Sequence, residues 1–271
     1  MLSKRFFKFS VLCLIAVFML AACGSNDDAE KNGEGSAKNS LEAIKDKDKI
    51  VFGVKNDTRL FGLKNPSSGK VEGFDIDIAK ALTKEILGDE SKAEFVEVTS
   101  KTRVQLLQNG KIDAVVATMT ITEERKKEVD FTDVYFEAGQ SLLVKKGSKI
   151  KSVDDLKKGT KVIAVKGSTS AVNIAEKAPD AEVLQYENYS EAFTALKSGQ
   201  GDALTTDDSI LYGMADEDPD YELTGGQFTE EPYGIAVKKD SPELVKELNE
   251  ALKALKDNGT YDEIYNKWIK K

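Results

Sequence analysis

A short succession of elements occurs twice in this chain of 271 residues, and it limits the folds that the chain can adopt. The segments LLQNGKIDAVVAT (residues 106–118) and ALKSGQGDALTTD (residues 195–207) share one layout. Each has a helix end, an Asn-Gly or Ser-Gly pair, a spacer, an Asp-Ala pair and an apolar strand. This weak internal repeat suggests two similar α/β lobes.

The apolar pattern around each copy alternates between strand and helix. Strands are expected at residues 50–54, 93–98, 113–117, 161–165, 182–186 and 202–206, and helices at 74–86, 103–108, 168–178 and 189–196. In the helix at 74–86, Phe74, Ile78, Leu82 and Ile86 recur every four residues, as on a buried helix face. Alternating strands and helices predict a parallel sheet with covering helices in each lobe.

Two strand-like segments, 141–144 and 233–237, are expected to carry the chain from one lobe to the other and back. The helical patterns at 244–255 and 261–269 would then pack on the first lobe. We therefore predict an α/β fold with a two-strand hinge, lobe 1 at 41–142 and 237–271, and lobe 2 at 143–236. A ligand is expected in the crevice between the lobes, at the strand ends.

The N-terminus has the layout of a secretory signal peptide. Lys4, Arg5 and Lys8 precede an apolar run at 11–22, which is too short to span a bilayer comfortably. The run ends in Leu-Ala-Ala-Cys, which resembles the lipobox of bacterial lipoproteins. We predict a signal peptide at 1–22 and a lipid anchor on Cys23; an ordinary signal peptide or an N-terminal anchor is the alternative. Residues 24–40 contain no apolar residue larger than alanine, so 23–40 is predicted to be a flexible tether.

Composition excludes several classes of function. The chain has no histidine, so it can form neither a Ser-His-Asp triad nor a histidine-ligated metal site. The 39 basic and 47 acidic residues give a net charge of −8, which argues against a general nucleic-acid binder. Any catalysis would have to rest on carboxylates, lysine or tyrosine. No such pair stands out in the sequence, so we expect a protein that is not an enzyme and that uses no metal and no cofactor.

The first candidate for ligand binding is the block at 118–131, directly after a predicted strand. Thr118 and Thr120 supply hydroxyls beside the N-terminus of a following helix, where an anion can bind. Arg125 could form two charge-assisted hydrogen bonds with a carboxylate. The alternative is that Thr122 only caps the helix and that the charged residues after it form a solvated face.

Two further candidates lie in the second lobe. Asp207 follows a strand and could accept hydrogen bonds from an ammonium group, or it could cap the next helix. The turn at 166–170 offers Lys166, Thr169 and Ser170 at the start of a helix. Its residue order is not that of a phosphate-binding Walker loop.

Lys55 and Arg103 are a pair of cations at strand ends in the first lobe. Solvation at the surface is the usual fate of a single Lys or Arg and is the alternative for each. With Arg125 and Asp207, we expect these groups to stay charged across the physiological pH range.

Several motifs together resemble the polar amino-acid substrate-binding proteins of ABC transporters. They are GFDIDIAKAL (73–82), NGKIDAVVATMTITEERKKEVDF (109–131), DALTTDDSILYG (202–213) and YGIAVKKDSPEL (233–244). The resemblance covers about residues 47–271 and implies a periplasmic-binding-protein fold of type II. It implies that Thr120 and Arg125 bind the α-carboxylate of the ligand and that Asp207 binds its α-ammonium.

The resemblance implies the extracellular component of an importer, which captures an L-amino acid by hinged closure and delivers it to a membrane permease. Lys55 and Arg103 favour a carboxylate side chain over a neutral amide, because a buried unpaired charge is costly. The sequence therefore predicts a binder of glutamate or aspartate, with glutamine as the alternative. A dehydratase-type enzyme, as in some relatives, or an added adhesin or sensor role are further alternatives. We expect a lipid-anchored monomer on the outer face of a cell membrane, with a Gram-positive cell favoured.

Overall fold

The structure, a computed structural model, describes residues 40–269. The predicted signal peptide, Cys23 and all but the last residue of the predicted tether lie outside the described residues. Within the described part of the chain, no helix has both the length and the apolar character needed to cross a membrane.

Five strands form the first sheet: β1 (Ile50–Val54), β5 (Ala93–Glu97), β6 (Ala114–Val115), β7 (Val129–Ala138) and β13 (Glu231–Lys238). Their order is β5-β1-β6-β13-β7. The strands β1, β5 and β6 are parallel, and β13 is antiparallel to both β6 and β7. The connecting helices are α2 (Phe74–Leu87), α3 (Arg103–Gln108) and α4 (Glu123–Lys126), with a 3-10 turn at Glu90–Lys92. The expected buried face of α2 is confirmed, since Phe74, Ile78 and Leu82 are fully buried.

Five other strands form the second sheet: β8 (Gln140–Lys145), β9 (Lys161–Val165), β10 (Glu182–Tyr186), β11 (Ala203–Asp207) and β12 (Tyr221–Thr224). Their order is β10-β9-β11-β8-β12, in which β9, β10 and β11 are parallel and β8 is antiparallel to β11. The helices of this lobe are α5 (Thr169–Lys177), α6 (Tyr189–Lys197) and α7 (Asp208–Glu217), with a 3-10 turn at Val153–Asp155. The two sheets thus share a layout, and β6 and β11, from the two repeat copies, hold the same place in it.

The chain passes between the sheets at Gly139, between β7 and β8, and at residues 225–230, between β12 and β13. The two crossings are hydrogen-bonded to each other, since the Phe228 N–H donates to the Gln140 carbonyl at 2.9 Å. The predicted crossing segments were wrong in detail: 141–144 lies within β8 and 233–237 within β13, each paired inside one sheet. The predicted lobe boundaries at 142/143 and 236/237 stay predictions and fall inside these strands.

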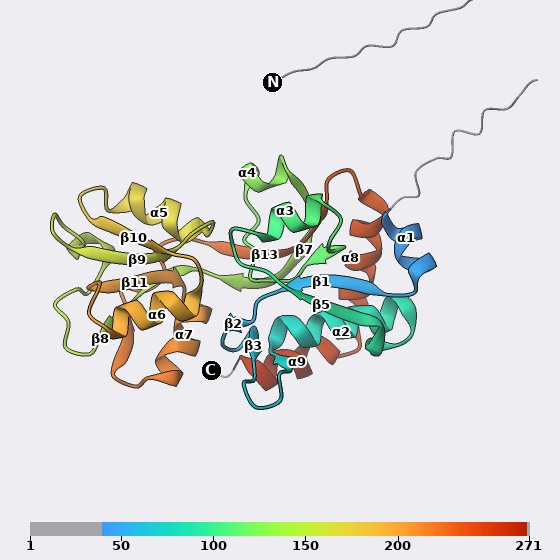
Figure 1. The fold of residues 1–271 in the computed structure, drawn as a ribbon, viewed down its shortest axis with the longest axis horizontal. Coiled ribbons are helices and arrows are strands. Elements are labelled where there is room, and N and C mark those ends of the chain that lie inside the picture. Colours follow the sequence, from blue (N-terminus) through green and yellow to red (C-terminus); the bar gives the residue numbers. More distant parts are fainter. Residues whose placement is uncertain (1–39, 270–271) are drawn as a thin grey trace, which may run out of the picture. The chain divides into compact units, whose positions relative to one another are not determined.

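Three helices complete the first lobe: α1 (Ser40–Lys47), α8 (Pro242–Asp257) and α9 (Thr260–Trp268). Both C-terminal helices pack on α2, and α8 also contacts β7 and α1, as Figure 1 shows on the right. A small sheet of β2 (Asp57–Thr58), β3 (Gly62–Lys64) and β4 (Val71–Glu72) projects from this lobe, and β2 contacts α6 of the other lobe. The predicted α/β fold with two lobes is confirmed.

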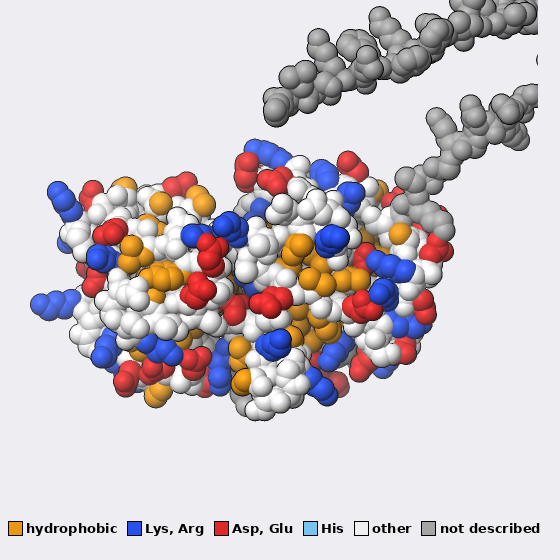
Figure 2. Space-filling model, viewed as in Figure 1, with side chains coloured by type: hydrophobic (Ala, Val, Ile, Leu, Met, Phe, Trp, Pro, Cys, Tyr) orange, Lys and Arg blue, Asp and Glu red, His pale blue; other side chains and the backbone are white. Residues whose placement is uncertain are grey.

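The surface mixes charges of both signs. In Figure 2, Lys and Arg side chains are interspersed with Asp and Glu side chains over both lobes. The acidic excess of the sequence is therefore spread over this face and does not gather in one patch.

Candidate functional site

A set of buried polar side chains lies at the strand ends where the two lobes meet. The sequence predicted six of them as ligand residues, and each is at most 4% exposed: Lys55, Arg103, Thr118, Thr120, Ser170 and Asp207. Polar groups are rarely buried to this degree unless they have a specific partner. The contacts of each group therefore show what the site can bind.

Arg103 opens α3 and turns its guanidinium toward the backbone after β6. Its Nη1 donates to the carbonyl of Ala117 at 2.7 Å and to that of Thr118 at 3.3 Å. Burial, together with the nearby charge of Arg125, lowers the pKa of Arg103 to about 9. The Thr118 N–H donates in turn to the Asp75 carboxylate at 3.1 Å. Part of the Arg103 guanidinium is thus committed to protein carbonyls.

The segment around Arg125 both caps a helix and supplies a side chain to the site. Thr122 does cap α4, because its hydroxyl accepts from the Arg125 N–H at 3.1 Å. The Arg125 side chain nevertheless turns away from the solvated face. Its Nη1 donates to the Thr120 carbonyl at 2.7 Å, and its Nη2 donates to the Gly167 carbonyl of the other lobe at 3.1 Å. Its guanidinium therefore lies between the lobes.

Lys55 is completely buried. Its ammonium donates to the Ser100 hydroxyl at 2.8 Å and lies 4.8 Å from the centre of the Tyr189 ring. Burial lowers the pKa of Lys55 to about 7. The expectation that this group stays charged across the physiological pH range was wrong, because burial in the site disfavours the ammonium form.

Asp207 ends β11 and does not cap α7 with its side chain. One carboxylate oxygen accepts a hydrogen bond from the Tyr233 hydroxyl at 2.6 Å. Burial, and then the negative charge of Glu231, raises the pKa of Asp207 to about 7. Here too the expected constant charge was wrong, and the group needs a positive partner to stay ionised at neutral pH.

The turn at 166–170 places its predicted residues differently. The Thr169 hydroxyl lies 3.4 Å from that of Thr120 across the lobes and donates to Glu231 at 2.8 Å. Ser170 donates to Thr206 at 3.3 Å within the buried set. Lys166 instead forms an ion pair with Glu187 and keeps a side-chain exposure of 39%, so it lies outside that set.

Other contacts join the lobes around this set. The Tyr189 N–H donates to the Asp57 carboxylate at 2.6 Å, and Arg59 forms an exposed ion pair with Asp216 at 3.0 Å. A Cβ atom added to Gly167 would lie 2.7 Å from the Lys101 Cα, so the two backbones are in close contact. The lobes therefore meet around the site as well as at the hinge.

Four buried side-chain atoms have no hydrogen-bond partner among the described residues: Asn56 Oδ1, Arg103 Nε, Thr118 Oγ1 and Asp207 Oδ1. Three of them belong to predicted ligand residues. A buried polar atom without a partner is costly, so each is a place where a ligand can contribute a hydrogen bond. The set offers an acceptor for an ammonium group on β11 and donors for a carboxylate near β6, which suits a free amino acid.

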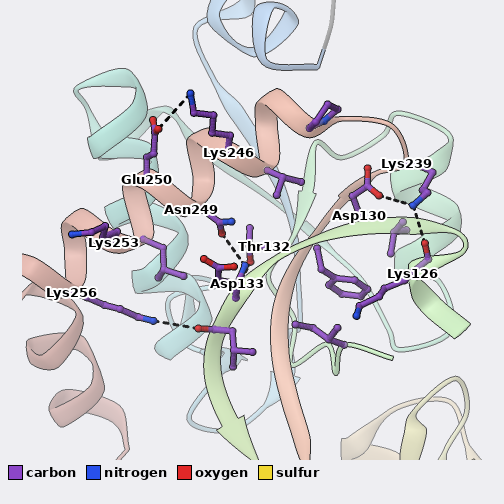
Figure 3. A pocket seen from close by; sticks show the side chains of 17 residues that line it. Lys126, Asp130, Thr132, Asp133, Lys239, Lys246, Asn249, Glu250, Lys253 and Lys256 are labelled. Atoms are coloured by element: carbon purple, nitrogen blue, oxygen red, sulfur yellow. Dashed lines mark hydrogen bonds and ion pairs between the residues drawn. The ribbon is translucent and has the colours of Figure 1, made fainter. Parts of the chain in front are cut away.

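A surface groove of about 1100 Å³ lies elsewhere on the first lobe, between β7 and α8 (Figure 3). It contains none of the predicted ligand residues. Its lysines have partners within the protein; Lys239, for example, donates to Asp130 at 2.7 Å, and Lys256 donates to the Val134 carbonyl at 3.3 Å. No group of three or more acidic or cysteine side chains in residues 40–269 is arranged to hold a metal ion.

The sequence did not predict the residues that contact and position the predicted ligand residues. Asp75, Tyr189, Tyr233 and Glu231 are all buried and each contacts a predicted ligand residue or its partner. Asp75 stands in the GFDID motif and Tyr233 in a predicted strand, so both were within quoted segments. Their roles depend on contacts between residues far apart in the chain, which a single sequence does not reveal.

Residues 50–271 match the bacterial extracellular solute-binding proteins, family 3. The chain is 71% identical over 267 residues to the ABC transporter glutamine-binding protein GlnH of Bacillus subtilis (strain 168), covering 98% of both chains. It is 58% identical over 252 residues to a glutamine-binding protein of Geobacillus stearothermophilus, covering 90% of this chain and 96% of that one.

Among solved structures, an ancestral arginine-binding protein bound to glutamine is similar, with a TM-score of 0.77 and 46% identity. That match covers 82% of this chain and 98% of the other. These relatives are binding proteins rather than enzymes, as the sequence predicted. By fold, by motifs and by this match, the chain belongs to the family 3 extracellular solute-binding proteins and is an amino-acid-binding component of an ABC importer.

Proposed function

We propose that this protein captures L-glutamine outside the cell and delivers it to the permease of an ABC importer. The observation that carries the proposal is the 71% identity to a glutamine-binding protein over 98% of both chains. At this identity and coverage, the two proteins are expected to share the whole fold. The second glutamine-binding relative, at 58% identity, supports the same ligand.

In the proposed complex, Arg125 and Thr120 of the first lobe bind the α-carboxylate. The Arg125 guanidinium, partly exposed and placed between the lobes, is suited to a bidentate contact with a planar carboxylate. Asp207 of the second lobe binds the α-ammonium through the oxygen that has no protein partner. An ammonium beside this carboxylate would favour its ionised form and so offset the effect of burial on its pKa.

This proposal replaces the predicted preference for glutamate or aspartate, because the relatives at 71% and 58% identity are glutamine-binding proteins, whereas the glutamate-binding relatives match at only 32–34% identity. The state of the two cations gives a physical reason. Arg103 is partly used by the carbonyls of Ala117 and Thr118, and burial lowers the pKa of Lys55 to about 7. The side-chain pocket therefore presents less free positive charge than the sequence suggested.

A neutral amide also needs an acceptor for its N–H groups. Asn56 directly follows Lys55; its Nδ2 donates to Glu97 at 3.1 Å, and its buried Oδ1 has no partner among the described residues. We assign it the side-chain N–H of glutamine. A carboxylate in the same place would have no proton to donate, and the Asn56 oxygen would stay unpaired.

The test is a calorimetric titration of the purified protein with L-glutamine, L-glutamate, L-aspartate and L-arginine. We expect glutamine to bind at least about tenfold more tightly than either acidic amino acid, a difference of about 1.4 kcal/mol. Tighter binding of glutamate or aspartate would reject the proposal and restore the preference that the sequence suggested. Tightest binding of arginine would reject both.

Binding is proposed to proceed from the first lobe to the second. Glutamine first contacts Arg125 and Thr120, and Asp207 with the turn at 166–170 then completes the site. The contacts already present between the lobes, such as Arg125 with Gly167, favour the arrangement in which both halves of the site are in place.

We also propose that the protein is a monomer held at the outer face of the membrane by a lipid on Cys23. The charged start, the apolar run and the Leu-Ala-Ala-Cys end of the predicted signal peptide support this. We expect Cys23→Ser to move the protein from the membrane fraction to the medium, or to leave it as an uncleaved precursor, and to lose the mass of the lipid. Wild-type membrane association and intact mass in this variant would contradict the anchor.

A further inference from the structure

Thr118 has an unusual backbone conformation for its residue type. Its φ angle is 45°, in the left-handed region that a β-branched residue rarely adopts. It is 4% exposed, it follows β6, and its hydroxyl is one of the buried atoms without a partner. A strained residue of this kind persists only where its surroundings hold it, and such residues cluster at ligand sites.

Two buried ionisable side chains hold the backbone of Thr118, one at its N–H and one at its carbonyl. The Asp75 carboxylate accepts from the Thr118 N–H at 3.1 Å, and Arg103 Nη1 donates to the Ala117 carbonyl at 2.7 Å and to the Thr118 carbonyl at 3.3 Å. Asp75 is fully buried and Arg103 is 2% exposed. Hydrogen bonds from the charged Arg103 guanidinium are stronger than neutral ones, and burial strengthens hydrogen bonds further.

Both oxygens of the fully buried Asp75 carboxylate already accept hydrogen bonds from the protein. One oxygen accepts from Thr118, and the other accepts from the Tyr135 hydroxyl at 2.9 Å. Tyr135 lies on β7, one of the strands that lead to the hinge, and its ring stacks on that of Phe74 at 6.2 Å. Asp75 therefore acts on the site only through the residues that it holds.

We infer that Asp75 and Arg103 are positioning residues for ligand binding. They fix the left-handed conformation of Thr118 and so aim its hydroxyl into the site. For Arg103 this differs from the side-chain contact that the sequence suggested, because its Nη1 group holds the protein backbone. The inference adds two residues to the proposed glutamine site. It rests on the proposed function only in the experiment that measures glutamine affinity.

The test compares Asp75→Ala with Asp75→Asn. Asparagine can still accept from the Thr118 N–H through Oδ1, and its amide can donate to the Tyr135 oxygen; alanine can do neither. We expect Asp75→Ala to raise the Kd for L-glutamine about tenfold or more and Asp75→Asn to raise it less than about threefold. Thr83→Val is the matched control, since it removes a buried hydrogen bond at 2.8 Å within the same helix but away from Thr118.

A purely structural role would give a different result. It would lower the melting temperature in Asp75→Ala and Thr83→Val alike and leave the glutamine Kd of the folded protein unchanged. That result, or equal weakening by the alanine and asparagine variants, would overturn the inference.

A second readout needs no ligand. Hydrogen exchange of the Thr118 amide, measured by NMR without glutamine, reports directly on its bond to Asp75. We expect faster exchange in Asp75→Ala and in Arg103→Met, which removes the donor to the Ala117 and Thr118 carbonyls, and wild-type exchange in Asp75→Asn. Unchanged exchange in Arg103→Met would overturn the inference even if Asp75→Ala does not fold. If the wild type prefers another amino acid, the proposed function fails, but the exchange rates still decide the role of Asp75.

Discussion

At the scale of single residues, the buried ionisable groups of the site lower the stability of the ligand-free protein. Lys55, Asp75 and Asp207 each have a pKa moved to about 7, and in each the largest cause is burial. Burial penalises whichever form carries the charge, so the free site is costly near neutral pH. A ligand ammonium that pairs with Asp207 recovers part of that cost, as is common where function conflicts with stability.

Asp207 allows this cost to be measured. Its pKa is raised from 3.8 to about 7 in the folded protein, with Glu231 adding to the effect of burial and Tyr233 and Arg125 opposing it. Between about pH 4 and pH 7 the folded state therefore binds more protons than the unfolded state, so this group makes the protein less stable as the pH rises. Asp207→Asn cannot ionise and escapes this loss.

We therefore expect the unfolding free energy of Asp207→Asn, minus that of the wild type, to increase from pH 5 to pH 8 by about 2–3 kcal/mol. Urea unfolding of both ligand-free proteins at the two pH values measures it. A difference that stays constant or shrinks as the pH rises would show that the Asp207 carboxylate is not destabilised by burial. The same measurement with saturating glutamine should give a smaller increase, because the ligand ammonium pairs with the carboxylate.

At the scale of helices and strands, the sequence predicted most of the parallel parts of both sheets. The expected strand at 50–54 is β1, that at 161–165 is β9, and the helix at 74–86 is α2 with one more residue. These elements have an apolar period that belongs to one element alone and does not depend on distant partners. Local pattern was therefore sufficient for them.

The long strand β7, at Val129–Ala138, was not predicted. Charged residues stand among its apolar ones, as Asp130, Asp133 and Glu137 show, and its burial alternates irregularly. Its pairing with β13 also shifts register at Gly234, so neither strand keeps a clean period of two. Strands of this kind are specified by their partner, and the partner here lies about a hundred residues further along the chain.

The residues of the candidate site also fall into two groups, those that the sequence could predict and those that it could not. Residues at strand ends, such as Thr118 and Asp207, could be predicted because the fold and the family motifs place them at the crevice. The partners that set their charge and conformation, Tyr233 for Asp207 and Asp75 for Thr118, could not, since they come from other elements. The preference for an acidic ligand was argued from the charge of Lys55, which depends on burial that the sequence does not give.

At the scale of the whole molecule, binding depends on how closely the two lobes approach. Gly167 marks this contact, because a Cβ atom there would lie 2.7 Å from the Lys101 Cα and 2.8 Å from the Ser100 carbonyl oxygen of the other lobe. The obstructing atoms are backbone and cannot turn aside as a side chain would. The Gly167 carbonyl also accepts from Arg125, so the contact lies beside the proposed carboxylate site.

Gly167→Ala should therefore hold the lobes apart and raise the Kd for glutamine at least about tenfold, a loss of about 1.4 kcal/mol. Gly199→Ala is a matched control, because Gly199 has a similar φ angle of 71° against 76° but no atom within 4 Å of an added Cβ. Both substitutions place alanine in the left-handed region, which costs about 1–2 kcal/mol of stability. Both variants should thus lose similar stability without ligand, and only Gly167→Ala should lose affinity in calorimetry. Equal glutamine affinities for the two variants would mean that the close contact at Gly167 is not needed for binding.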